Sequence, residues 1–415
     1  MDETQIYLRP KKRAALKKIE EGLEDLTGKL SVKIYKNSTI KPRGQIINIQ
    51  QSKNQYTVID DIDYCSDIIP CENPKEEITI LYGGYFRHQW GHFLLNSTAR
   101  LWWLIENQTN MALIDKIIFI STPGEKDCID GNYREFFELL GIYDKIEIIK
   151  DSHSYQKIIV PDISFEHDKF YAKEMIGVFN KIKENSSLCG TSKDYKELKK
   201  IFLTRSKLPG AKNKEFNLFL FDNLWEDNGF KVIAPEKVPL RQLVQILKQA
   251  ETIVSVSGST AHNLVFASSE ASITIMERVA TINDFQIGIS KILGQDVRYL
   301  DCFLYPIIPI PTGNVFYYFP TSLFQNFFND KKLKFFNDKI LKNFYRNSNV
   351  FKFFSSYKKQ SGHFLGLSDN AYDLESIAEA YFETSQIFGE AMKNESYFKF
   401  LMKKSLSKLK RKLKL

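Results

Sequence analysis

Polar and charged residues stand at the ends of three strand-like runs in the middle of the chain. Arg205 follows one apolar run and Glu277 follows another. In an open α/β sheet, ligands bind where strands end, and a cation beside the N–H groups at a helix start suits phosphate. We therefore expect a nucleotide-diphosphate site in which Glu277 accepts hydrogen bonds from ribose hydroxyls. The third run ends in a turn that opens a helix-like segment and contains Ser257, Gly258, Ser259, Thr260 and, slightly later, Asn263.

Two simpler interpretations of these residues remain open. Arg205 and Glu277 could pair with each other at the sheet edge. The serine-rich turn could be an ordinary capped connection between a strand and a helix, since most such turns bind nothing.

A second segment, near residue 90, carries groups suited to proton transfer. His92 would lie on a helix that begins near Trp90, with His88 one turn earlier and Arg100 two turns later. Imidazole titrates near neutrality, so His92 is the candidate general base, although a buried structural histidine is the alternative. The two histidines could share a metal ion, but no third ligand is apparent, and we expect no metal. Tyr85 and Trp90 would line the acceptor side or pack in the core.

Both segments lie within longer runs that resemble one enzyme family. The first half contains Gly-Gly-Tyr-Phe at 83–86 and Gln-Trp-Gly-His-Phe-Leu-Leu at 89–95. The second half contains Ile-Phe-Leu-Thr-Arg at 201–205 and Ser-Gly-Ser-Thr-Ala-His-Asn at 257–263. In this order, over about residues 80–300, the chain resembles glycosyltransferase family 61 of the bacterial polysaccharide-biosynthesis type.

The resemblance implies an inverting, metal-independent glycosyltransferase without a cofactor. The donor would be a nucleotide sugar, with a UDP-sugar favoured, and the acceptor a saccharide or lipid-linked glycan in capsule- or lipopolysaccharide-type synthesis. The departing diphosphate would be held by Arg205, Lys212 and the N–H groups of the turn.

The chain departs from the family pattern at three places. Ser257 and Ser259 stand where His and Ala are usual, and Lys212 is nearest to a second arginine. Asn96 stands where the family usually has an acid. Because a neutral amide cannot accept the acceptor's proton at neutral pH, His92 becomes the preferred base.

Alternating strand-like and helix-like runs predict an α/β fold with parallel βα units in both halves. The resemblance implies a GT-B-like pair of Rossmann-type doubly wound domains facing a cleft. We expect an acceptor-side domain at 1–190 and a nucleotide-sugar-binding domain at 200–305. A crossing segment and C-terminal helices would occupy 306–415.

Some local expectations complete this arrangement. An amphipathic helix is predicted over 10–30 and another helix over 170–183. Short strand-like runs occupy 46–49 and 58–59, followed by an acidic run at 60–63 that we interpret as a solvated turn. The phenylalanine-rich stretch 316–357 is predicted to be helical and partly apolar on its surface, and 374–393 to be a further helix.

The composition is that of a globular protein. The chain has 415 residues, 43% of them hydrophobic, and lacks any uninterrupted apolar stretch of the roughly 18 residues that a membrane span needs. Its five cysteines include no CxxC pair, which favours free thiols in a reducing compartment over disulfides or a zinc site. We therefore expect a cytoplasmic protein without a signal peptide.

The stretch 399–415 is basic and amphipathic. It holds eight lysine and arginine residues and no acid, in a chain with a formal net charge of +8. Apolar residues recur in it at helical spacing, so we expect peripheral binding to the inner face of the cell membrane. A solvated terminal helix is the alternative, and nucleic acid is not expected as a partner.

Two functions other than glycosyl transfer are alternatives. A non-catalytic protein of the same fold, binding sugar or nucleotide within a polysaccharide assembly, would explain Asn96 and Ser257. A serine hydrolase built on 255–260 is disfavoured because the turn lacks the GxSxG pattern and His363 is the one plausible histidine downstream.

Overall fold

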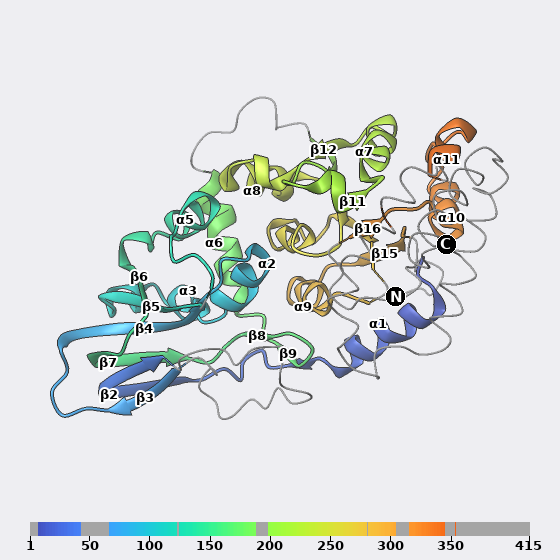
Figure 1. The fold of residues 1–415 in the computed structure, drawn as a ribbon. Coiled ribbons are helices and arrows are strands. Elements are labelled where there is room, and N and C mark those ends of the chain that lie inside the picture. Colours follow the sequence, from blue (N-terminus) through green and yellow to red (C-terminus); the bar gives the residue numbers. More distant parts are fainter. Residues whose placement is uncertain are drawn as a thin grey trace, which may run out of the picture.

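A computed structural model describes residues 7–42, 66–122, 124–187, 198–279, 281–303 and 315–344, together with residue 353 (Figure 1). Within these residues the fold is mixed α/β, as predicted, and contains two large sheets. Several expectations fall outside the described residues: the runs at 46–49, 58–59 and 60–63, the helix at 374–393 and the basic stretch 399–415.

The first sheet has six strands in the order β3-β2-β7-β4-β5-β6. Strand β7 pairs in parallel with β4, as do β4 with β5 and β5 with β6. The predicted parallel strands are therefore present in this half, and strand β2, which is antiparallel to both β3 and β7, was not predicted. The strands are β2 (Val32–Pro42), β3 (Ser66–Pro70), β4 (Glu76–Phe86), β5 (Lys116–Ser121), β6 (Ile146–Ile149) and β7 (His153–Pro161).

The antiparallel strand β2 has a physical explanation. Its residues are mostly exposed or half-buried, and lysine, asparagine and serine interrupt its apolar positions. An antiparallel strand tolerates this composition because one of its faces can meet water, whereas the parallel strands of a covered sheet read as apolar runs.

The second sheet is entirely parallel, with the order β12-β10-β13-β14-β15. In chain order this is 2-1-3-4-5, so the winding direction reverses between β10 and β13. Such a reversal leaves a crevice outside the carboxyl ends of the two strands, where open α/β sheets bind ligands. The strands are β10 (Lys200–Leu203), β12 (Lys231–Ile233), β13 (Thr252–Val256), β14 (Ser272–Glu277) and β15 (Val297–Asp301).

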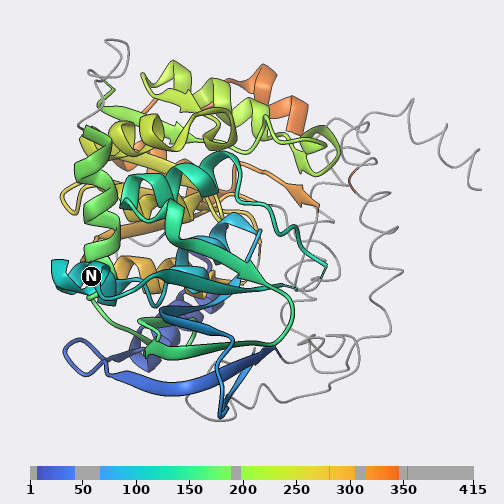
Figure 2. The same cartoon turned by 90° about the vertical axis from the view of Figure 1, so that its left-hand side faces the viewer.

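The two sheets are joined by helices that pack on one another. Helix α6 (Met175–Ser187) contacts α5 (Gly131–Leu140) from the first half and α8 (Leu240–Gln249) from the second. One buried hydrophobic cluster includes Leu81 and Phe137 as well as Ile201 and other residues of the second sheet. Figure 2 shows the second-half helices, in yellow-green, above the strands of the first sheet. The halves therefore share a core.

The segment 170–183 begins as a strand and only then becomes helical. Strand β9 (Phe170–Tyr171) pairs with β1 (Glu24–Asp25), and α6 starts at Met175. The pairing also ends the N-terminal helix early: α1 spans Pro10–Gly22, shorter than the predicted 10–30.

Helix α1 is anchored on the second sheet although it comes first in the chain. Lys12 Nζ lies 2.8 Å from Glu277 Oε2 and 3.2 Å from Asp301 Oδ1, and all three side chains are buried. Tyr7 forms a parallel bridge with Leu300. These contacts tie the start of the chain to the carboxyl ends of β14 and β15.

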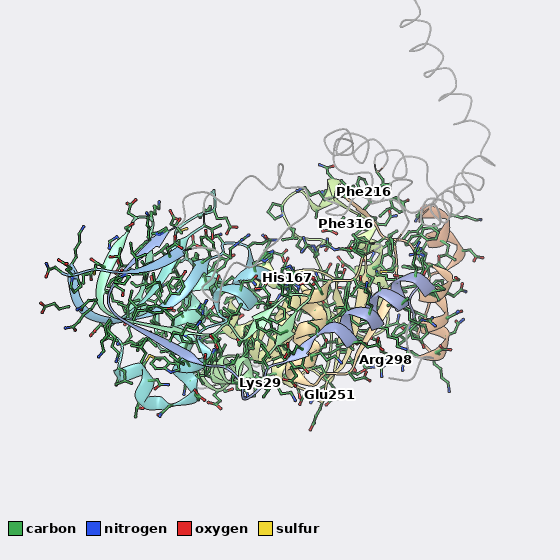
Figure 3. All side chains as sticks on the ribbon, turned by 90° about the horizontal axis from the view of Figure 1, so that it is seen from below. Lys29, His167, Phe216, Glu251, Arg298 and Phe316 are labelled. Atoms are coloured by element: carbon green, nitrogen blue, oxygen red, sulfur yellow. The ribbon has the colours of Figure 1, made fainter. Side chains whose placement is uncertain are left out.

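The phenylalanine-rich stretch covers the other face of the second sheet. It forms β16 (Phe316–Tyr317), α10 (Ser322–Asp330) and α11 (Asp338–Phe344), and Figure 3 labels Phe316 beside Phe216 on the partner strand β11 (Glu215–Phe216). The described part, 316–344, contains the two helices after a short strand, so the helical prediction is confirmed there in part. The phenylalanines of α10 are buried rather than on the surface. They cluster with side chains of the sheet and of α7 (Leu218–Asp227), because both faces of a parallel sheet must be covered.

Within the described residues, no helix combines the length and the apolar character that crossing a bilayer requires.

Candidate functional site

The turn after β13 forms around a glycine in a left-handed conformation. Gly258 has φ of +95°, and a Cβ at this position would lie 2.7 Å from Nη2 of Arg278. The Ser257 N–H donates to the Met276 carbonyl at 2.9 Å, which fixes the turn to the next strand. Glycine is therefore required both for the backbone geometry and for the close approach of an arginine.

Two arginines share one buried carboxylate beside this turn. Arg205 Nε lies 2.8 Å and Arg278 Nη1 3.0 Å from Glu215 Oε1, and the Tyr318 hydroxyl donates to the other oxygen at 2.9 Å. Burial would raise the pKa of Glu215, but the two guanidinium groups outweigh burial and hold this pKa below its usual value. The three charged groups together carry one net positive charge.

Arg205 connects this cluster to an open cleft of about 370 Å³. Its Nη1 donates to Thr260 Oγ1 at 3.3 Å, and its side chain is 18% exposed. The cleft lies at the reversal point of the second sheet, between β10 and β13, where a ligand is expected. It is lined by Trp90, Asp130, Gly131, Asn132, Tyr133, Arg205, Leu208, Pro235, Glu236, Ser259, Thr260 and Asn263.

The two segments singled out in the sequence meet in this cleft. The Trp90 indole N–H donates to Asn263 Oδ1 at 2.9 Å across 173 positions of sequence. Gly91 packs so closely on His262 and Ser259 that an added Cβ would clash with the imidazole. His262 is buried, and burial lowers its pKa to about 4, so the ring is neutral at physiological pH.

His92 and Asn96 form a pair on the segment that follows. Their side chains meet at 2.9 Å between Nδ1 and Oδ1, so the imidazole donates from Nδ1 and leaves Nε2 with its lone pair. Burial lowers the pKa of His92, although the bond to Asn96 opposes this effect. His92 also packs edge-on against Phe285 at 5.0 Å, and it is not among the described residues that line the cleft.

The helix that carries His92 begins at Trp90, as predicted, so His88 precedes it. Helix α2 (Trp90–His92) begins only after His88 and continues as a π-helix over Phe93–Ser97, which changes the four-residue periodicity. His88 instead lies beside Cys128 and Asp130.

The structure places Arg100 and Tyr85 in the core of the first half. Arg100 is 2% exposed, donates to the carbonyl of Pro161 and stacks over the ring of Tyr82 at 5.5 Å. Tyr85 belongs to the buried cluster on one face of the first sheet. Neither is among the described cleft residues, so core packing, the alternative raised for Tyr85, describes both.

Glu277 and Lys212 also lie outside the cleft lining. Glu277 follows its strand as predicted, but it is 1% exposed and paired with Lys12 rather than with Arg205. Burial raises the pKa of its carboxyl, and Lys12 opposes this shift. Lys212 is exposed on a short 3-10 turn, Ala211–Asn213.

Two residues of this cluster, Glu215 and Arg278, were not predicted from the sequence. Glu215 and Arg278 lie 63 positions apart and meet only through the fold. Arg278 could have been noticed, because it directly follows Glu277 at the end of a predicted strand. Side chains of successive residues in a strand point to opposite faces of the sheet. Because Glu277 points to the face where Lys12 lies, the next residue, Arg278, is expected on the opposite face of the second sheet.

Part of the chain matches one known family model. Residues 90–274 match the family model described as Glycosyltransferase 61. No match is found among curated proteins. The matched region begins at Trp90 and runs into β14, so it includes all the residues that line the cleft. Arg278, which contacts the cleft residue Arg205 through Glu215, lies outside both the match and the lining.

Proposed function

We propose that this glycosyltransferase, which carries a family 61 domain, transfers a sugar from a nucleotide-sugar donor with inversion at the anomeric carbon. The observation that carries the proposal is the Arg205–Glu215–Arg278 cluster beside the Gly258 turn, at the reversal point of the second sheet. An acceptor hydroxyl attacks the anomeric carbon as the bond to the diphosphate oxygen breaks. The electron pair of that bond leaves with the nucleoside diphosphate.

The arginine cluster suits a leaving group that gains negative charge. Arg205 and Arg278 are fixed by a buried carboxylate, so little reorganisation is needed when charge develops on the diphosphate. In this proposal the guanidinium groups do the work that a divalent ion does in other transferases. The 3-10 helix after the turn, Ala261–Phe266, has only six residues, so the charge comes mainly from the arginines and less from a helix terminus.

His92 is the proposed general base. Its pKa is lowered by burial, so it is neutral at physiological pH, and Asn96 orients it with Nε2 free to take the acceptor proton. Asn96 thus positions the base instead of serving as one. Trp90 lines the cleft and His92 does not. For His92 to act as the base, the acceptor must therefore extend past Gly91 to the side of His92 that packs on Phe285.

The cleft also holds a carboxylate that could compete for this role. Glu236 lines the cleft directly. Replacing His92 by Gln should lower turnover by roughly 10²–10⁴-fold if His92 is the base, with Glu236→Gln much less affected. The opposite ranking in a transfer assay would move the base to Glu236.

The biological setting is also a proposal. A UDP-sugar donor, a saccharide or lipid-linked acceptor, and a role in bacterial capsule- or lipopolysaccharide-type synthesis agree with the resemblance in the sequence. We also propose a cytoplasmic location, which rests on the cysteine pattern of the sequence. Binding to the membrane surface depends on the stretch 399–415, which lies outside the described residues. Equal flotation of the full chain and a chain truncated before 399 on anionic vesicles would refute the membrane role.

A thermal-shift screen with nucleoside diphosphates and their sugars tests the donor site. A donor at about 100 times its Kd should stabilise the chain by roughly 2.7 kcal/mol. Arg205→Ala should abolish this shift, while Lys199→Ala, an exposed lysine next to the opposite end of β10, should retain it. An unchanged shift in Arg205→Ala would remove the assignment.

A further inference from the structure

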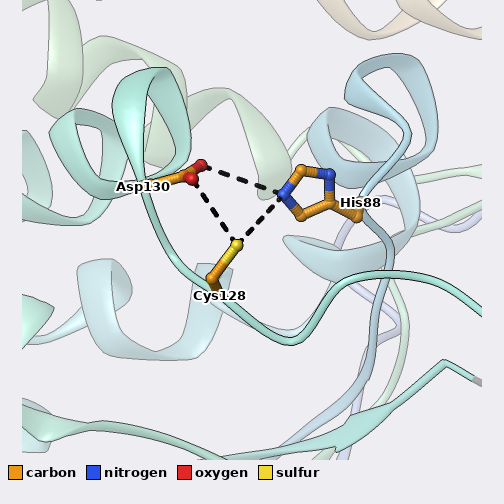
Figure 4. A group of neighbouring side chains, drawn as sticks. All are labelled: His88, Cys128 and Asp130. Atoms are coloured by element: carbon orange, nitrogen blue, oxygen red, sulfur yellow. Dashed lines mark hydrogen bonds and ion pairs between the residues drawn. The ribbon is translucent and has the colours of Figure 1, made fainter.

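Three potential metal-ligating side chains converge beside the cleft, none of them assigned to the transfer reaction. His88 Nε2 lies 4.0 Å from Cys128 Sγ and 3.9 Å from Asp130 Oδ1, and the Cys128 thiol lies 3.5 Å from Asp130 Oδ2 (Figure 4). The sequence raised a metal site only for His88 with His92, whereas the structure groups His88 with Cys128 and Asp130, about 40 positions away in sequence.

The cluster is held in place by its surroundings. The His88 N–H donates to the Glu125 carboxylate, and the Tyr133 hydroxyl donates to the His88 carbonyl at 2.8 Å. The imidazole packs on the ring of Tyr133, with 4.5 Å between centroids. The backbone and the ring of His88 are thus both fixed against the segment that carries the other two groups.

The carboxylate of Asp130 does not cap the helix that it precedes. Asp130 is the N-cap residue of α5, where an aspartate usually accepts a hydrogen bond from the first helical turn. Its side chain makes no such bond, and it lies toward Cys128 and His88 instead. This orientation is the second observation, besides proximity, that points to a ligand.

We propose that His88, Cys128 and Asp130 bind one Zn²⁺ ion. Zinc bonds of about 2.3 Å to sulfur and about 2.0–2.2 Å to nitrogen and oxygen would place tetrahedral ligand atoms roughly 3.3–3.6 Å apart. The observed separations of 3.5–4.0 Å require a contraction of only a few tenths of an ångström.

The chemistry of the three groups favours zinc over other divalent ions. A thiolate, a carboxylate and a neutral imidazole carry two negative charges, which balance Zn²⁺. Magnesium and calcium prefer sites made only of oxygen, whereas mixed sulfur, nitrogen and oxygen ligands suit zinc. The thiol proton is released to solvent when the metal binds.

The site joins two segments that border the cleft. His88 precedes α2, and Asp130 itself lines the cleft. Cys128 and Asp130 are exposed, so the fourth coordination position is open to water. Zinc would fix the segment 124–130 to the residues before Trp90, and the proposed chemistry at the arginines does not pass through it.

Metal titration of the full-length chain tests the site. Co²⁺ serves as the spectroscopic probe, because thiolate ligation produces a sulfur-to-cobalt charge-transfer band that Zn²⁺ displaces. The wild type should bind one equivalent with this band. Cys128→Ser should lose the band, His88→Gln should bind at least tenfold more weakly, and Cys71→Ser should match the wild type, because Cys71 is a half-buried thiol outside the cluster.

A second readout does not depend on the variants. Zn²⁺ should protect Cys128 of the wild type from alkylation, read by peptide mass spectrometry, and leave labelling of Cys71 unchanged. Absence of a one-equivalent cobalt complex, or equal labelling of Cys128 with and without Zn²⁺, would overturn the proposal. Either result would leave the nucleotide-induced thermal shift, and hence the proposed function, untouched.

Discussion

The two sides of the cleft are built from different kinds of contact. On the side of the second sheet, Arg205 and Arg278 are positioned by ion pairs to the buried Glu215. On the other side, Trp90 is positioned by stacking on Phe93, with 5.5 Å between ring centroids, and by one hydrogen bond across the cleft. The positive charge lies on one side, and the other side presents the aromatic rings of Trp90 and Tyr133 with the carboxylate of Asp130. This division fits a site that binds an anionic leaving group on one side only.

The largest expected effect is the loss of the shared carboxylate. Glu215→Gln would leave two partly buried guanidinium groups without a counter-charge, and removing one partner of a buried pair costs about 3 kcal/mol or more. Urea unfolding should show this loss, while Glu138→Gln, in an exposed pair with Arg134, should change stability by less than about 0.5 kcal/mol. Equal stability of the two variants would contradict the picture of a charge-built donor side.

The Glu215→Gln variant should also change how the free energy of unfolding depends on pH in acid. The folded-state pKa of Glu215 lies below that of the unfolded chain. Its stabilising contribution is therefore complete above the unfolded pKa and is lost as pH falls through the folded pKa. Below about pH 4, the usual range of a free glutamate, the free energy of unfolding should therefore depend less on pH in Glu215→Gln than in the wild type.

The contact between the two sides should respond to pH through His262. Its pKa of about 4 in the folded state lies below the usual value of 6.5, so the unfolded chain binds the proton first. Stability should be complete above pH 6.5 and fall by about 3 kcal/mol as pH approaches 4. His262→Gln should lack this part of the pH dependence, and a curve parallel to the wild type between these values would contradict the assignment.

Gly258→Ala should separate backbone strain from displacement of the arginine. The new Cβ would require Arg278 to move, so donor affinity should fall by roughly tenfold, equivalent to about 1.4 kcal/mol. Gly229→Ala is the matched control, since Gly229 has φ of +80° but open space around it. The control should lose stability without losing donor affinity; a similar loss of affinity in both would show that the arginine contact is unimportant.

The smallest effect is expected on the aromatic side. Trp90→Phe keeps a ring on Phe93 but leaves Asn263 Oδ1, in a side chain that is 1% exposed, without the indole N–H. Thermal unfolding should report a loss of about 1 kcal/mol, and the affinity for nucleotide should change little. A loss of nucleotide affinity as large as that in Gly258→Ala would erase the distinction between the two sides.

The parallel strands of the second sheet were predicted from the sequence. Its strands are buried apolar runs, as in 252–256 and 272–277, separated by helices of regular periodicity. The antiparallel strands at the edge of the first sheet were not predicted, because β2 is half-exposed and its polar residues interrupt the apolar pattern typical of a strand. The continuous core between the halves could not be read from local patterns either, since it depends on helix packing.

The candidate site was predicted in part. The positions of Arg205, the Gly258 turn and Trp90 follow from strand ends and from the resemblance, and the structure brings them to one cleft. The partners that orient them come from distant parts of the chain, as Glu215 does for Arg278 and Lys12 for Glu277. Sequence spacing carries no signal for such pairs. Lys212 was expected as the second cation because it stands nearest to the family's second arginine.

That choice gives the most direct test of the central claim, that two arginines on one carboxylate hold the donor diphosphate. Calorimetric titration of UDP into the wild type, Arg278→Lys and Lys212→Ala compares the cation identified in the structure with the one expected from the sequence. We predict that Arg278→Lys weakens binding at least tenfold, because lysine cannot hold Glu215 and a phosphate in the same geometry. Lys212→Ala should bind like the wild type. Wild-type affinity in Arg278→Lys together with a loss in Lys212→Ala would contradict the account.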